Sequence, residues 1–349
     1  MVKRMKYKTL LLTDIHLSNK SIKGVSLIES QVRCLLDIIK KEKADEIIIM
    51  GDIFMQRKPS PTALMGLQEI ITFALDQGTK DLIMLRGNHD SETKADDGVT
   101  ALKVFEAHKG VRVIEHTYVS HDNKRVYIPH YEIQGRILKA LREAPKDYTL
   151  FGHFGFVGCL NSVGDKDFDI PLKEFKNRTY LGHIHKHYTS WSGNHPVTVV
   201  GTPYTTNFGE EGQLCYYGVK TSEEDDFTFK EILSGPRHLV IKYKDFVDNF
   251  ESYKELINTD EFSNLIRFTV GKDDKVDYAL LDKLSVIYID FKFAPLEEKD
   301  QQDQSEYTPP SELFSINDQI IEDYVDKHNT SLDREDIMWG LNTLKDEDR

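Results

Sequence analysis

Short hydrophobic runs alternate with segments of helical periodicity through the first 200 residues of the chain. Six runs have the length and composition of β-strands, namely Tyr7–Thr13, Glu46–Met50, Leu82–Leu85, Tyr148–Phe151, Tyr180–Leu181 and Val197–Val200. Between the first three, hydrophobic residues recur at helical spacing from Ile28 to Ile39 and from Leu64 to Leu75. Strands that alternate with helices in this way predict an α/β core built in layers.

The pattern changes after Ser234, where a smaller set of elements begins. Three strand-like runs, Arg237–Tyr243, Ile266–Val270 and Ser285–Phe293, are separated by helical stretches. They predict a small α+β module over residues 235–295, following a core of residues 1–234. Residues 296–311 are polar, acidic and Pro-ended, which predicts a linker. Two short amphipathic helices are expected in residues 312–349.

Acidic residues are concentrated near the end of the sequence. The net charge of the 349 residues is −13, but residues 296–349 alone hold 16 Asp and Glu against 5 Lys and Arg. The first 295 residues therefore have a net charge of only −2. The overall acidity thus does not exclude a local binding site for an anionic partner such as DNA.

Other features of the composition point to a cytoplasmic protein. No run of about 18 apolar residues occurs, so no membrane-spanning helix is expected. The first residues lead into a strand pattern instead of a secretory leader. Cys34, Cys159 and Cys215 are dispersed, without the spacing of a disulfide framework or a zinc finger. We expect them to be reduced thiols.

Five short polar motifs follow directly on predicted strands. They are Asp14-Ile15-His16, Gly51-Asp52, Gly87-Asn88-His89-Asp90, Gly152-His153 and Gly182-His183-Ile184-His185. The carboxyl ends of strands are where α/β proteins place their sites, and a glycine before the polar residue lets the backbone turn close to a ligand. Each motif alone is more often a loop without function. All five in this order favour one shared site.

The donor types of these motifs suit divalent metal ions. Aspartate, asparagine and histidine without thiolate fit Mn²⁺, Fe²⁺ or Zn²⁺ in a catalytic site better than a structural zinc site. Seven donors are enough for two ions if Asp52 bridges them, and His183 and His185 can each reach a different ion. Two divalent ions with the carboxylates of Asp14 and Asp52 leave a positive site. Such a site suits an anionic phosphodiester.

These residues resemble the motifs of the calcineurin-like metallophosphoesterase superfamily over about the first 210 residues. The resemblance implies a four-layer α/β sandwich, in which two mixed sheets are flanked by helices. It implies that one ion is held by Asp14, His16, Asp52 and His185, and the other by Asp52, Asn88, His153 and His183. His89 would stabilise the transition state or protonate the leaving oxygen, with a packing histidine as the alternative. Asp90 would orient His89 or, equally well, cap a turn.

Within the superfamily, residues 200–210 (VGTPYTTNFGE) resemble a stretch of the SbcD nucleases, as do residues 51–60 (GDIFMQRKPS). The layout is similar to that of the recombination endonuclease subunits of T-even-like phages. The resemblance implies a DNA exo- and endonuclease that uses two divalent ions, most suitably Mn²⁺ with Mg²⁺, Fe²⁺ and Zn²⁺ as alternatives. Many cellular relatives have a histidine where this chain has Met55, which leaves the balance of the two activities open.

The same resemblance implies an assembly. Residues 235–295 would form a DNA-capping domain, and the C-terminal helices of residues 312–349 would bind an SbcC-like ATPase of the SMC type. The nuclease subunit would be a homodimer within a heterotetramer that acts in DNA recombination, repair and replication. From the pattern alone, helices that pack on their own core explain the C-terminal periodicity equally well.

Two other functions remain to be weighed. A protein phosphatase, nucleotidase or cyclic-nucleotide phosphodiesterase would share the superfamily, but protein phosphatases usually read Gly-Asp-x-Val-Asp-Arg-Gly and Gly-Asn-His-Glu, which are absent. A scaffold without catalysis would be expected to have lost ligands, and all seven are present with His89. The remaining histidines lack a strand-end position and are expected to be surface or structural residues, with His187 pointing away from the metals; they are His108, His116, His121, His130, His187, His195, His238 and His328.

Overall fold

The computed structural model describes residues 7–18, 21–22, 25–159, 169–224, 226–272, 274–286 and 288–293. They belong to one structural unit, Met1–Pro295. The linker and the helices predicted for residues 296–349 lie outside the described residues. Within the described part of the chain, no helix is long and apolar enough to cross a membrane.

The first of two six-stranded sheets has the strand order β14-β13-β1-β4-β5-β6. Its strands are β1 (Lys8–Leu12), β4 (Glu46–Ile49), β5 (Asp81–Leu85), β6 (Val111–Ile114), β13 (Tyr216–Thr221) and β14 (Thr228–Glu231). Strands β1, β4, β5 and β6 run parallel, whereas β13 pairs antiparallel with β1 and with β14. The sheet is therefore mixed, and its parallel strands all come from the first 114 residues of the chain.

The second sheet has the order β11-β12-β10-β9-β8-β7. Its strands are β7 (Tyr118–Ser120), β8 (Arg125–Ile128), β9 (Thr149–His153), β10 (Thr179–Gly182), β11 (Tyr188–Ser192) and β12 (His195–Val199). Strands β8, β9, β10 and β12 are parallel, and the outer strands β7 and β11 are antiparallel to their neighbours. Parallel strands thus occupy the middle of this sheet as well.

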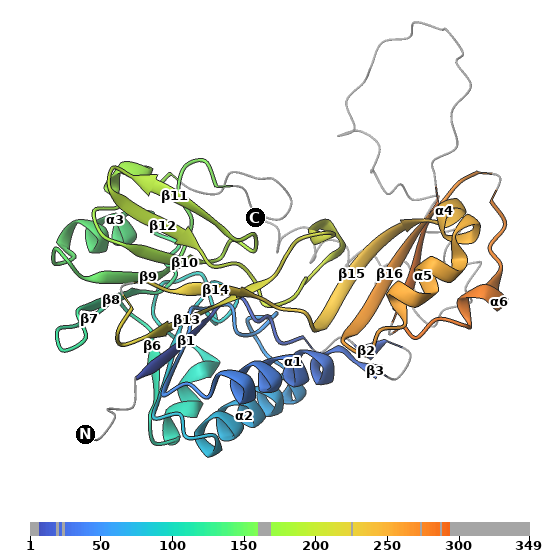
Figure 1. Cartoon of the computed structure of the whole chain (residues 1–349). Coiled ribbons are helices and arrows are strands. Elements are labelled where there is room, and N and C mark those ends of the chain that lie inside the picture. Colours follow the sequence, from blue (N-terminus) through green and yellow to red (C-terminus); the bar gives the residue numbers. More distant parts are fainter. Residues whose placement is uncertain are drawn as a thin grey trace, which may run out of the picture. The chain divides into compact units, whose positions relative to one another are not determined.

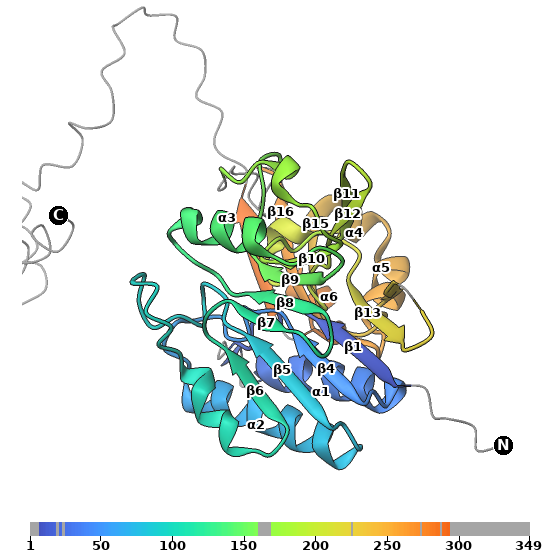
Figure 2. The same cartoon turned by 90° about the vertical axis from the view of Figure 1, so that its left-hand side faces the viewer.

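Helices cover the outer faces of both sheets, so the core has four layers (Figures 1 and 2). Helices α1 (Leu27–Glu42) and α2 (Pro61–Asp76) lie on the first sheet, and α3 (Gln134–Glu143) lies on the second. Along β1, Leu10 and Leu12 pack towards α1 and α2, while Leu11 packs between the sheets. Such strands are apolar on both faces because both faces are buried. The predicted fold class, a sandwich of two mixed sheets flanked by helices, is confirmed.

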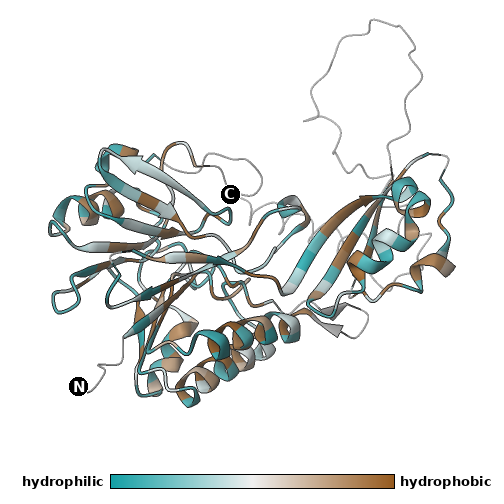
Figure 3. Ribbon diagram, viewed as in Figure 1, coloured by the Kyte–Doolittle hydropathy of each residue, from teal (hydrophilic) through white to brown (hydrophobic). Residues whose placement is uncertain are grey.

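A smaller three-stranded sheet follows, made of β15 (Gly235–Lys242), β16 (Phe262–Val270) and β17 (Tyr288–Phe293), all parallel. Helices α4 (Tyr243–Asp248), α5 (Phe250–Ile257) and α6 (Tyr278–Leu281) accompany it. Hydrophobic residues of strands and helices, including Phe246, Ile266 and Phe268, form a separate core between them. Figure 3 shows hydrophobic stretches on β15 and β16 and along α2.

The remaining described elements are short. They are the ribbon β2 (Ser21–Ile22) and β3 (Val25–Ser26), and the 3₁₀ helices η1 (Ala101–Ala107), η2 (Leu172–Glu174) and η3 (Phe208–Glu210). The loop that contains η3 joins the core to the small module, because η3 contacts β15. Helix α1 also contacts β15.

Candidate dimetal centre

The loops that follow the parallel strands of both sheets meet at one edge of the sandwich. The loop after β1 runs beside the loop after β4, with backbone hydrogen bonds from Asp14 N to Gly51 O (3.0 Å) and from His16 N to Asp52 O (2.9 Å). From the second sheet, His153 ends β9, and His183 and His185 follow β10. The carboxyl ends of parallel strands lie at the same edge, so all five motifs converge.

The backbone is forced into rare conformations at this edge. Asp14, His16, Asp52 and His183 have φ of 51°, 40°, 47° and 78°, in the left-handed region that non-glycine residues seldom adopt. Gly87 has a different role, because a Cβ there would lie 2.2 Å from Asp52 N. Strained residues of this kind cluster at functional sites, where the surrounding structure holds them in place.

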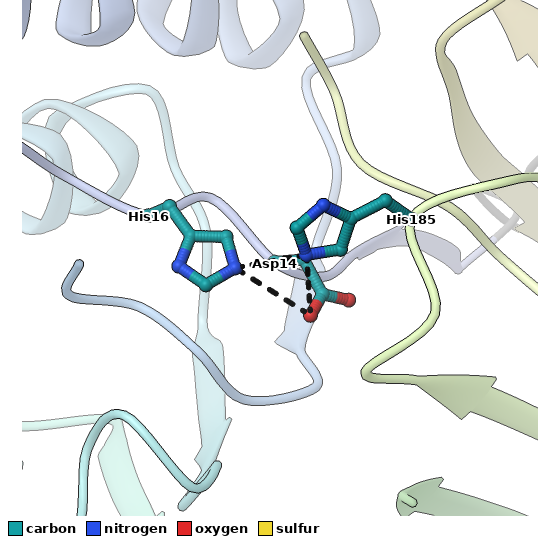
Figure 4. Close-up of side chains that lie close together, drawn as sticks. All are labelled: Asp14, His16 and His185. Atoms are coloured by element: carbon teal, nitrogen blue, oxygen red, sulfur yellow. Dashed lines mark hydrogen bonds and ion pairs between the residues drawn. The ribbon is translucent and has the colours of Figure 1, made fainter. Parts of the chain in front are cut away.

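Asp14, His16 and His185 form a first group of donors (Figure 4). The Nε2 atoms of His16 and His185 lie 3.1 Å apart, and both are within 3.9 Å of Asp14 Oδ1. Two of these side chains come from the first sheet and one from the second. Without a cation, one of the two Nε2 atoms has to donate to the other, whereas a cation between them would let both imidazoles and the carboxylate bind through lone pairs.

Asp52, Asn88, His153 and His183 form a second group. His153 Nε2 is 3.2 Å from both Asp52 Oδ1 and Asn88 Oδ1, and His183 Nδ1 is 2.8 Å from Asn88 Oδ1. The other carboxylate oxygen of Asp52, Oδ2, is 3.7 Å from His16 Nε2 in the first group. Asp52 therefore presents one oxygen to each group, which is the geometry of a bridging carboxylate.

The spacing of the donors fits divalent ions. With metal–nitrogen and metal–oxygen bonds of about 2.0–2.2 Å, two ligands at a right angle lie about 3 Å apart. The closest donor pairs in the two groups are 3.1 Å and 2.8 Å apart. The sulfur-free donor set matches Mn²⁺, Fe²⁺ or Zn²⁺ in a catalytic site. The structure thus brings together all seven residues that the sequence singles out as metal ligands.

Outer contacts fix which nitrogen two of the histidines present. His153 Nδ1 donates to Met50 O (2.6 Å), and His185 Nδ1 donates to Glu210 Oε1 (2.6 Å). In both rings Nε2 is left to face the donor group, as expected of metal-ligating histidines with an outer hydrogen bond. Glu210 was not singled out by the sequence reasoning; only its membership of the segment 200–210 drew attention to it.

Electrostatics at the site support a cation. Burial lowers the pKa of His16 well below its usual value and lowers that of His183 to about 3, so both rings are neutral. Burial also disfavours a proton on His153 and His185, but Asp52 raises the pKa of His153 to about 9 and Glu210 raises that of His185. These carboxylates attract positive charge, which a divalent ion would supply in place of the protons.

His89 lies beside the first group without belonging to it. Its ring is edge-on to that of His16, with centroids 5.2 Å apart. A carbonyl oxygen can only accept, so the 2.8 Å contact between His89 Nδ1 and Met55 O is a hydrogen bond donated by the ring. Nε2 is therefore the atom that can face a reacting group. His89 N also donates to Asp52 Oδ1 (2.9 Å), which fixes the bridging carboxylate.

Asp90 makes its hydrogen bonds to backbone N–H groups of two loops, and the ring of His89 is held by Met55 O instead. Its carboxylate accepts from the backbone N–H groups of Ile53, Phe54 and Gly87, at 2.9–3.2 Å. These bonds use the oxygen lone pairs of Asp90 and tie the loop after β4 to the loop after β5. The alternative prediction, a residue that caps a local turn, describes its contacts better.

One histidine outside the predicted set lies close to the centre. The ring of His130 stacks on that of His183, with centroids 5.8 Å apart and an interplanar angle of 21°. Neither ring nitrogen has a hydrogen-bond partner among the described residues. His130 follows β8, whose strand the sequence analysis did not identify. His187 contacts Val200 O (3.1 Å) and the ring of Tyr216 instead of the donor groups, as predicted.

A two-sheet sandwich with Asp, Asn and His donors gathered at one edge defines a metal-dependent hydrolase fold. A sequence profile of calcineurin-like phosphoesterases matches residues 7–187, which is more than half of the chain and includes all seven candidate ligands. The chain belongs to the calcineurin-like phosphoesterase family. Its members are metal-dependent hydrolases of phosphoesters.

A curated relative adds a weaker similarity. The chain is 33% identical over 88 residues to the SbcD subunit of the nuclease SbcCD from Staphylococcus saprophyticus. The aligned region makes up 24% of this chain and 23% of that relative. The match therefore spans less than a quarter of the relative's length.

Proposed function

We propose that this chain is a two-metal-dependent DNA nuclease, the nuclease subunit of a complex with an SbcC-like SMC-type ATPase. The observation that carries the proposal is the pair of donor groups that share Asp52, since two adjacent divalent ions suit hydrolysis of a phosphodiester. The similarity to a nuclease subunit directs the substrate towards DNA. DNA recombination, repair and replication are the processes in which such a subunit would act.

Two divalent ions, for which we propose Mn²⁺, would lower the pKa of a bound water and stabilise negative charge on the phosphate. The protein's part is to hold these groups in place. His89 would present Nε2 to the reacting phosphate, because Nδ1 is engaged by Met55 O. In the imidazolium form, with a proton on each nitrogen, Nε2 can donate a hydrogen bond to the phosphate or its proton to the leaving oxygen, which leaves a neutral ring that still donates from Nδ1 to Met55 O.

The module of residues 235–295 and the C-terminal residues 312–349 belong to the same proposal. We assign the module the role of a DNA-capping domain, because its sheet adjoins the loop of Glu210, next to the donor groups. The C-terminal residues would bind the ATPase, and a homodimer of nuclease subunits would complete the assembly. The side chain of Met55 cannot donate a proton, so the balance of exo- and endonuclease activity has to be measured.

The decisive experiment compares cleavage of linear duplex and single-stranded DNA with Mn²⁺ by the wild type and three variants. The His89→Ala variant should cleave more slowly but still bind two ions. The Asn88→Ala variant should bind one of the two ions more weakly and should not cleave. His195→Ala is the matched control, because His195 is an exposed residue at the start of β12. Metal content is measured on each purified protein.

Other outcomes would identify other functions. Hydrolysis of a small diester such as bis(p-nitrophenyl) phosphate without cleavage of DNA, even with an SbcC-like ATPase and ATP, would replace the nuclease by a phosphodiesterase of small molecules. A protein that binds no transition metal and hydrolyses neither substrate would be a scaffold. Wild-type cleavage by His89→Ala would remove the role assigned to His89.

A further inference from the structure

A cavity of about 530 Å³ lies where the core meets the small module. We call it the junction cavity; its walls include Met55, Thr206, Phe208, His238, Arg267 and Tyr288. Its volume is in the range of sites that bind small organic groups. Residues from the loop after β4, from the η3 loop and from all three strands of the small sheet contribute to it.

Two residues that line the junction cavity contact side chains beside the proposed metal centre. Met55 lines the cavity, and its carbonyl oxygen holds the ring of His89. Thr206 lines it from another side, and its hydroxyl donates to Glu210 Oε1 (2.9 Å), the atom that also holds His185. A group in the cavity would therefore lie within a short reach of a phosphate bound at the centre.

The walls of the cavity suit a planar, uncharged group better than a phosphate. Arg267 is paired with Asp290 through a 2.7 Å contact from Nε to Oδ2, so it brings little net charge. Its guanidinium lies over the ring of Phe208, 4.2 Å from the centroid. Tyr288, in contrast, has no hydrogen-bond or ring partner among the described residues and is only half-buried. It is an aromatic side chain that is free to stack on a ligand.

The register of the small sheet explains how these groups share one face. Residues 238, 265 and 288 pair across the three strands, and residues 240, 267 and 290 form the next row on the same face. The opposite face, with Ile266 and Phe268, packs in the hydrophobic core with the helices. The exposed Lys242 and Lys292 continue the first face. They place positive charge beside the cavity, where a nucleic-acid backbone could pass.

We propose that the junction cavity binds one unstacked nucleobase of the DNA strand that is being cleaved, with Tyr288 as its stacking platform. The inference rests on the proposed nuclease function and deepens it. A base that has left the duplex can stack on an aromatic side chain whatever its identity, while leaving a duplex costs free energy. The site therefore favours single-stranded or frayed DNA over intact duplex, without strong sequence preference.

The test combines deletion of a base with deletion of the ring. Full-length protein cleaves single-stranded oligonucleotides in which one abasic residue is placed at successive positions around the cut. In the wild type, an abasic residue at one of these positions should raise KM by about 5- to 150-fold, which is the loss in affinity expected when one base–aromatic stack is removed. Tyr288→Ala should raise KM on the intact oligonucleotide by a similar factor, and the abasic residue at that position should add nothing further. Tyr288→Phe, which keeps the ring, should restore the wild-type KM.

Tyr278→Ala is the matched control, because Tyr278 is an exposed tyrosine on α6 of the same module. It should behave as the wild type with every substrate. Multiplicative effects of Tyr288→Ala and the abasic residue, or an unchanged KM in Tyr288→Ala, would overturn the base site while leaving the nuclease intact. If the wild type hydrolyses bis(p-nitrophenyl) phosphate but cleaves no DNA, the proposed function fails, and this inference fails with it.

Discussion

Glu210 offers the sharpest test of how the metal centre is built, because it contacts a predicted ligand without being one itself. The residue is 3% exposed, and its carboxylate accepts from His185 Nδ1 (2.6 Å), Thr206 N (2.7 Å) and Asn207 Nδ2 (2.7 Å). Substitution of Glu210 by glutamine keeps the shape and one acceptor oxygen but removes the charge. The change removes the charge beside His185 and also turns one acceptor into a donor, because the amide nitrogen faces Thr206 N when the amide oxygen faces His185.

The size of the effect follows from these contacts. A hydrogen bond to a charged acceptor is roughly twice as strong as a neutral one, and loss of such an outer contact typically lowers metal affinity about 10- to 100-fold. Glu210→Gln should shift the Mn²⁺ concentration for half-maximal activity upwards by that factor, about 1.4–2.8 kcal/mol. Activity at saturating Mn²⁺ should return to near the wild-type level, because all seven donors are still present.

The assay is hydrolysis of bis(p-nitrophenyl) phosphate as a function of Mn²⁺ concentration, with calorimetric titration of the metal-free protein as a second readout. Glu231→Gln serves as the control, since Glu231 is an exposed residue at the end of β14. An Mn²⁺ dependence identical to that of the wild type would refute the assignment of Glu210 as the outer partner of a ligand. A loss of activity that no Mn²⁺ concentration restores would contradict it as well.

Three further predictions concern the same edge of the sandwich. Asp90→Ala leaves three buried amide groups unpaired, at about 1–3 kcal/mol each before water or movement compensates, so urea denaturation should show a loss of about 3–5 kcal/mol in the free energy of unfolding. Burial opposes the proton on His153, but Asp52 raises the pKa of this ring to about 9. In the metal-free protein the His153–Asp52 pair therefore stabilises the fold fully below pH 6.5, and this contribution is lost as the pH rises towards 9. Mn²⁺ affinity should increase over the same range, because the ion replaces the proton, and thermal melts with and without Mn²⁺ check both signs. His130→Phe keeps the ring stacked on His183, so the variant should retain two ions. A kcat below that of the wild type at full metal content would show that the imidazole nitrogens of His130 act on the substrate. Unchanged kinetics would limit the role of His130 to packing.

Hydrophobic periodicity was sufficient to predict six of the buried parallel strands of the core and the two large helices, but it missed the parallel strands β6 and β8. Strand β4 consists of Glu46 and three isoleucines, all buried. A short run that is apolar on both faces is typical of a strand buried within a parallel sheet. Strand β11 (Tyr188–Ser192) was not identified, because it is an outer strand of polar and half-buried residues. Outer strands bury little surface, so their pairing is set by neighbours that are distant in sequence.

The donor set could be predicted for a related reason. Asp14, Asp52 and Asn88 each follow a strand directly, and parallel strands bring their carboxyl ends together whatever the loops between them. The partners of these donors could not be predicted. His89 is held by the backbone carbonyl of Met55, and a pattern of side chains in the sequence does not predict a backbone contact. Glu210 contacts His185 although 25 positions separate them in the sequence. His130 follows a strand that was itself missed.

The position of the centre between two sheets ties the geometry of the donors to the packing of the core. The first group combines Asp14 and His16, from the loop after β1, with His185, from the loop after β10. The second group also takes donors from both sheets. The distance between its members is therefore set by the hydrophobic layer between the sheets, which includes Leu11 and Phe151. Close-packed interiors transmit strain instead of absorbing it. A shift of one sheet against the other would therefore separate donors within each group, and the affinity for both proposed ions would fall together.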